Sequence, residues 1–133
     1  MEVARAEVGG EAPQSFDEIS QVLTAKSWAE LKNMKSPPEL VVKVMSAINI
    51  LYGVKAGWAE TLKVLKDPNS YNSIKYFDVG CIKPKQFKAL TKIVKDPQCN
   101  FETVKRKSNA AGGVVLFIKL VYVYAYAMNA TCR

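Results

Sequence analysis

The stretch from Ser36 to Gly53, SPPELVVKVMSAINILYG, decides the fold. Ser36 suits the N-cap of a helix, Pro37 suits its first position, and Glu39 follows the cap by three residues, as a capping box requires. Apolar residues then recur every three to four positions, and Gly53 is placed to end the helix in a left-handed conformation. The stretch therefore predicts an amphipathic helix over residues 37–52.

Two Asp-Pro pairs mark the ends of further short helices. One helix begins near Trp58 and stops at residues 67–68, and another opens at Pro84 and stops at residues 96–97. Proline disfavours a helical conformation of the residue before it, which is why each helix must end there. Asn100 can cap one more helix. A brief helix between the two Asp-Pro helices is carried by Tyr71, Ile74 and Phe77.

Residues 114–128, VVLFIKLVYVYAYAM, form an ambiguous segment. Their β-branched and aromatic composition favours a strand. The run of 15 residues is longer than a usual strand of about 5 to 6, however, so a buried helix stays open. A transmembrane helix is less favoured, because the run is shorter than about 18 residues and carries Lys119 near its middle.

Composition excludes several classes of protein. With 133 residues, 49% of them hydrophobic, the chain fits one compact domain. It has no His, which removes His-based triads and the usual catalytic zinc sites, and its three cysteines are too scattered to complete a metal site. We therefore expect no enzyme, no metal and no cofactor.

Positive charge is concentrated in the middle of the chain. Residues 35–110 hold fourteen Lys and Arg against six acidic residues, a net charge of +8. This charge predicts an acidic partner, with nucleic acid, an anionic membrane and an acidic protein surface all open. Four lysines share one helical stripe away from the apolar face, and we expect that stripe to be solvated. They are Lys85, Lys88, Lys92 and Lys95.

Several short motifs occur in one order along the chain. They are the pair Pro37-Pro38, the helix over residues 41–53, Trp58-Ala-Glu, residues 67–78 with Asp-Pro-Asn and Phe-Asp, and Ser108-Asn-Ala-Ala-Gly. Together they resemble the microtubule-binding domain of dynein heavy chains over roughly residues 16–128. The Phe-Asp pair and the Asp-Pro-Asn motif are more similar to ciliary than to cytoplasmic dyneins.

The resemblance implies an all-α fold, a small bundle of about six short helices that caps the distal end of an antiparallel coiled-coil stalk. Pro37 and Pro38 would form the hinge between stalk and head. The implied segments are a leader or frayed stalk end at 1–15, a distal stalk helix at 16–36, the microtubule-binding head at 37–113, and a last helix at 114–133 that runs into the second stalk strand.

The resemblance also implies a function. The head would dock in the groove between tubulin subunits, and the register of the stalk would switch its affinity as a remote AAA+ ring hydrolyses ATP. The implied partners are the microtubule, the rest of the heavy chain and, in some dyneins, an accessory light chain. The implied location is the cytoplasmic cytoskeleton, in a cilium or flagellum axoneme. A basic nucleic-acid-binding module and a membrane-active helical protein remain as alternatives, although neither nucleic acid nor membrane is the expected partner.

The same resemblance carries over contact residues. Arg106 matches a basic position of the family late in the fifth helix. The family usually has Lys one place after the position of Val41, where this chain has Val42 followed by Lys43. That shift turns the charge by about 100° around the helix. The expected contact set is Arg106, Lys105, Lys107, Lys43, Lys35, Lys75 and Lys66.

Overall fold

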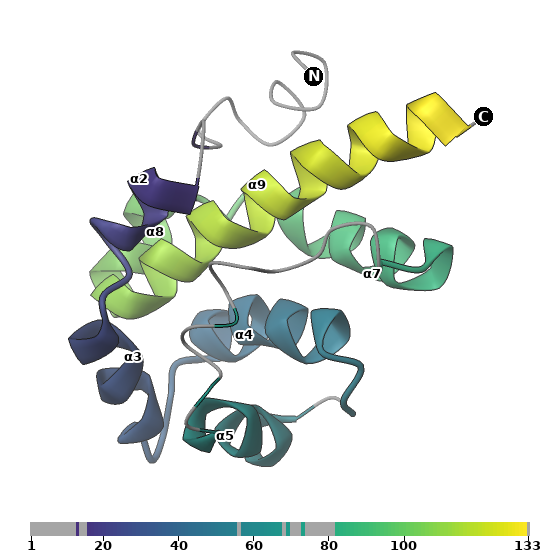
Figure 1. Ribbon diagram of the computed structural model, residues 1–133. Helices are drawn as coiled ribbons and strands as arrows, with labels where there is room; N and C mark the ends of the chain where they lie inside the picture. Colours follow the sequence, from purple (N-terminus) through teal and green to yellow (C-terminus); the bar gives the residue numbers. More distant parts are fainter. Residues whose placement is uncertain are drawn as a thin grey trace.

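One long helix, α9 (Asn109–Cys132), organises the other helices around it. In the computed structural model α9 contacts α2, α3, α4, α7 and α8, and Figure 1 shows its C-terminal end projecting beyond them. The structure describes residues 13, 16–55, 57–67, 69, 73 and 82–132, which form seven helices and no strand. The other six are α2 (Phe16–Ser20), α3 (Ala25–Lys32), α4 (Glu39–Leu51), α5 (Trp58–Lys66), α7 (Pro84–Val94) and α8 (Phe101–Lys107). The predicted all-α class is confirmed.

Burial on almost every side explains why residues 114–128 are helical. The side chains from Val114 to Val123 are buried, apart from the half-buried Leu116. Tertiary packing of this kind overrides a local preference for strand. The length argument against a membrane span was wrong, because the helix starts at Asn109 and is long enough to cross a bilayer. In this structure the helix packs inside the protein, where 78% of its most apolar 18-residue stretch is buried.

Helix α4 lies between α5 and α9 and begins later than predicted (Figure 1). Its N-cap is Pro38, with φ −58° and ψ 150°, and no side chain caps it. The predicted capping box of Ser36 is therefore wrong. The second proline disfavours a helical Pro37, and Pro38 is itself extended, so the helix begins at Glu39. The predicted left-handed Gly53 is confirmed, with φ 70°.

A buried polar network fixes the turn between α4 and α5. Asn49, only 1% exposed, donates from Nδ2 to the carbonyl oxygens of Lys55 at 3.1 Å and Gly57 at 3.2 Å. Its Oδ1 accepts a hydrogen bond of 2.9 Å from the Thr61 hydroxyl, which also lies 3.1 Å from the Gly57 oxygen. These bonds satisfy the buried amide of Asn49 and tie it to the loop between α4 and α5.

The two Asp-Pro pairs form matching turns at helix ends, as the sequence predicts. The Oδ1 atom of Asp67 accepts from the backbone N–H of Asn69 at 2.9 Å, just after α5. The Oδ1 atom of Asp96 accepts from the N–H of Gln98 at 2.8 Å, just after α7. Asn100 caps α8, also as predicted. Of the brief helix expected over 71–77, the structure describes only Ser73, which is helical; the other residues lie outside the described part.

The segment 16–36 holds two helices, α2 and α3, and not one continuous helix. Thr24 caps α3 by accepting from the N–H of Ser27, at 3.1 Å, and so starts a new helix after a turn. Leu23, in that turn, is 1% exposed and packs on α9 at Gly113. A Cβ at Gly113 would lie 2.9 Å from the Leu23 Cβ and 3.3 Å from its backbone, so the approach requires glycine.

The boundary expected between residues 113 and 114 falls inside α9, which runs unbroken from Asn109. Ser108 closes α8 and its Oγ accepts from the N–H of Ala111 at 3.2 Å, so it caps the start of α9. Head and last helix are thus one continuous piece.

Candidate functional site

The basic end of α8 is the centre of the candidate surface. Lys105, Arg106 and Lys107 are exposed and occupy the last turn of the helix, where the partial negative charge of the helix end favours cations. The Nζ atom of Lys105 lies 5.3 Å from the ring centroid of Phe101. Among the described residues, Arg106 takes part in no ion pair. Its charge is available to a partner.

Packing on α9 sets the position of this basic turn. Val104 is fully buried, and a Cβ at Gly112 would lie 3.1 Å from the Lys105 Cβ, so α8 rests closely on the first turn of α9. Helix α8 also contacts α4. The basic turn is therefore held on the hydrophobic core by two helices, which gives its side chains a fixed base.

Lys43 on α4 lies beside the same region. Its ammonium pairs with Oδ2 of Asp96, in the turn that leads from α7 to α8. The Nε2 atom of Gln86 donates to the Ile50 carbonyl at 2.9 Å, at the opposite end of α4. These two contacts make α4 and α7 antiparallel, and they bring the first half of α4 next to the approach to α8.

The remaining expected contact residues do not all gather there. Lys35 is exposed in the loop just before α4. Lys66 ends α5, which packs against α3 and α4, whereas α8 packs mainly on α9 (Figure 1). Lys66 therefore belongs to another part of the surface. Lys75 lies outside the described residues.

The lysine stripe of α7 faces solvent, as expected: Lys85, Lys88, Lys92 and Lys95 are all exposed. The opposite face of the helix is buried. Its Phe87 ring stacks on Tyr122 of α9 with centroids 5.3 Å apart and planes 2° apart. Because α7 is anchored through this apolar face, its lysines contribute to the basic field and not to the core.

The segment just before the expected hinge at Pro37 and Pro38 is tied to α5. The indole Nε1 of Trp58 donates to the Met34 carbonyl at 3.3 Å, which attaches the end of α3 to the first turn of α5. The spacing of Trp58 predicts only an amphipathic helix, and nothing local indicates this bond. Sequence reasoning missed it because the partner is 24 residues away.

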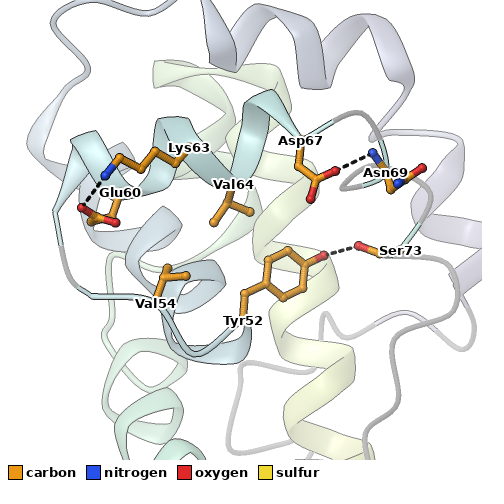
Figure 2. A pocket seen from close by; sticks show the side chains of 8 residues that line it. All are labelled: Tyr52, Val54, Glu60, Lys63, Val64, Asp67, Asn69 and Ser73. Carbon is orange, nitrogen blue, oxygen red and sulfur yellow. Dashed lines mark hydrogen bonds and ion pairs between the residues drawn. The ribbon is translucent and has the colours of Figure 1, made fainter.

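A pocket of about 540 Å³ was also missed (Figure 2). Its lining includes Tyr52, Val64 and Asp67, from the ends of α4 and α5. The Tyr52 hydroxyl forms a hydrogen bond of 2.7 Å with the Ser73 hydroxyl. Burial raises the pKa of Tyr52; the bond to Ser73 opposes that shift and the nearby Asp67 charge adds to it. These residues meet only through the fold, so no sequence pattern signals the pocket.

Comparison with known proteins assigns a family. The sequence pattern described as the microtubule-binding stalk of dynein motor matches residues 1–131. The dynein-1-beta heavy chain of the flagellar inner arm I1 complex of Chlamydomonas reinhardtii is 30% identical over 105 residues, 79% of this chain. Human dynein axonemal heavy chain 6 is 29% identical over 97 residues, 73% of this chain.

Cytoplasmic relatives match as well. The cytoplasmic dynein heavy chain of Dictyostelium discoideum is 34% identical over 101 residues, 74% of this chain. The chain spans about 2% of the length of each of these relatives. The family pattern nevertheless covers nearly all of it, and every relative named is a dynein heavy chain. This chain therefore belongs to the family of microtubule-binding stalk domains of dynein motors.

Proposed function

We propose that this domain docks in the groove between tubulin subunits through the basic end of α8, with Arg106 as the main contact and Lys105 and Lys107 beside it. Lys43 and Lys35 extend the contact along the start of α4, and Lys75 and Lys66 add to the basic field. The observation that carries the proposal is the exposed basic turn of α8, held against both α4 and α9. A basic rim of this kind steers a protein to an acidic partner.

The affinity is set by the register of the two stalk strands, one formed by residues 16–36 and the other by α9. The continuity of α9 with the core supports this role, because a shift of α9 changes the packing of α8 and α4 directly. The shift comes from ATP hydrolysis in the AAA+ ring of the same heavy chain, so the domain itself is not catalytic. Such a register is a two-state element of the kind that couples distant sites.

The location is the axoneme of a cilium or flagellum. Two named relatives are flagellar or axonemal, and the Asp-Pro-Asn and Phe-Asp motifs point the same way. The partners are the microtubule, the rest of the heavy chain and an accessory light chain.

Parallel co-sedimentation tests the function. The chain is mixed with microtubules, duplex DNA or anionic liposomes over a range of salt concentrations. We expect it to pellet with microtubules at salt that abolishes pelleting with DNA and liposomes. Equal binding to any polyanion would favour the nucleic-acid module, and binding to liposomes alone would favour the membrane-active protein.

A further inference from the structure

Ser36 offers a hydroxyl that the fold does not use. It is exposed in the loop between α3 and α4, and it forms no hydrogen bond among the described residues. The capping role that its sequence position predicts falls to Pro38 instead. The residue that follows Ser36 is Pro37, and this is the single Ser-Pro or Thr-Pro pair in the 133 residues.

The loop presents Ser36 outside any regular helix, where an enzyme can reach it. A residue before proline is driven to extended backbone angles, and Pro38 is itself extended with ψ 150°. Lys35 beside it is exposed too. The serine therefore stands exposed in a loop outside any helix, directly before a half-buried Pro37.

We propose that Ser36 is a phosphorylation site for a proline-directed protein kinase, and that its phosphate weakens the attachment of the domain to microtubules. The Ser36 oxygen attacks the γ-phosphorus of ATP, and the new P–O bond forms as the bond to the bridging oxygen of ADP breaks. ADP leaves, and the hydroxyl proton passes to a base of the kinase. The effect on attachment rests on the proposed function; the modification itself does not.

A phosphate on Ser36 would stand two residues before the N-cap of α4, whose first turn also carries Glu39. The first backbone bond of α4 runs from Val42 N–H to the Pro38 carbonyl at 3.1 Å, so the N–H groups before Val42 have no acceptor within the helix. A phosphoserine carries about −1.5 to −2 charges and strong acceptor oxygens, which suit such a helix start. It would also lie next to Lys35, whose charge it would neutralise within the proposed microtubule contact.

The experiment treats the 133-residue chain with a proline-directed kinase and ATP, and maps the phosphate by mass spectrometry. We expect one phosphate at Ser36, none in Ser36→Ala, and a large loss in Pro37→Ala, which keeps the hydroxyl. Microtubule co-sedimentation then compares phosphorylated and untreated chain. We expect the affinity to fall by about three- to tenfold, and Ser36→Ala to bind like the untreated chain before and after kinase treatment.

The outcomes separate the two claims. Absence of phosphate from Ser36 in the folded chain overturns the proposal, and so does a phosphate at Ser36 that leaves microtubule affinity unchanged. If the untreated chain does not bind microtubules, the proposed function fails and with it the claim about attachment, whereas mass mapping still decides the modification. Circular dichroism of each variant shows that lost phosphorylation is not lost folding.

Discussion

The ammonium of Lys43 and the carboxylate of Asp96 join α4 to the turn after α7, across 53 residues of sequence. Asp96 uses both oxygens, because Oδ1 accepts from the N–H of Gln98 while Oδ2 pairs with Lys43. The side chains are 46% and 21% exposed, so solvent screens the pair. One carboxylate therefore accepts the hydrogen bond that forms the local turn and also makes a solvent-screened ion pair between two helices.

Substitution of Asp96 separates those two roles. Asp96→Asn keeps an oxygen for the N–H of Gln98 and removes the charge, so we expect it to lower the free energy of unfolding by less than about 1 kcal/mol. Asp96→Ala also loses the turn and should cost about 1 kcal/mol more. Urea denaturation measures both. Equal losses would mean that the ion pair, and not the turn, holds this junction.

Arg106→Ala should weaken microtubule binding more than Lys92→Ala. Arg106 belongs to the proposed contact, whereas Lys92 lies on the solvated stripe of α7. Both variants remove one positive charge, so they are matched in net charge. A charge pair at a rim contributes about 0.2 to 1 kcal/mol and a desolvated one 2 or more, which a co-sedimentation isotherm resolves. Equal losses would show that total charge matters and placement does not.

Gly113→Ala should destabilise the domain by about 1–3 kcal/mol, because the new methyl group meets the Cβ and the backbone of Leu23. Gly112→Ala is the matched control. Its methyl group would lie 3.1 Å from the Lys105 Cβ and 3.2 Å from the Lys105 Cα, a milder contact than at Gly113, and the gain in helix propensity of up to about 1 kcal/mol partly offsets it. Thermal unfolding compares them. A milder effect at Gly113 than at Gly112 would refute the close packing of Leu23.

Asn49→Leu should cost about 1–3 kcal/mol of stability, since it removes the buried amide that bonds to the Lys55 carbonyl, the Gly57 carbonyl and the Thr61 hydroxyl. Thr61→Ser keeps the hydroxyl and serves as the control, with a smaller loss. Chemical denaturation gives both values. If Asn49→Leu were neutral, the buried network would not be what orders the turn between α4 and α5.

Microtubule affinity should depend on the register of the stalk. Residues 16–128 are fused to a rigid coiled coil in two or more registers, and co-sedimentation is compared at fixed salt. A half-heptad slide moves a helix by about 5 to 6 Å, enough to exchange one set of packing contacts for another. We expect strong and weak binders from one head. Indistinguishable affinities would mean that the register of the stalk does not control how tightly the head binds microtubules.

Local chemistry accounts for most of what the sequence predicts. Asn100, Pro84 and the two Asp-Pro turns act within a few residues, and each lies where the sequence predicts it. Ser36 does not cap the helix, because Pro38 disfavours a helical conformation of Pro37, the residue that would follow the cap. The helical state of residues 114–128 was expected from the resemblance, because composition alone favours a strand.

The parts that could not be predicted depend on distant partners. Gly113 meets Leu23, Trp58 meets Met34, and Lys43 pairs with a residue in another helix turn. Each of these contacts joins a single pair of residues, so none of them produces a repeating pattern in the sequence from which it could be predicted. The basic turn of α8 was expected as a contact from the resemblance, whereas the pocket beside Tyr52 is assembled from separate segments and has no such signal.

The unbroken course of α9 has a mechanical consequence. A tensile load on its C-terminal end reaches the core along one hydrogen-bonded rod, because no turn interrupts it between Asn109 and Cys132. A load applied through α2 must instead cross the turn at residues 21–24 and the loop at residues 33–38. The two ends of the described chain thus transmit load differently, and we expect a relative displacement between them to be absorbed mainly by the turn and the loop on the N-terminal side.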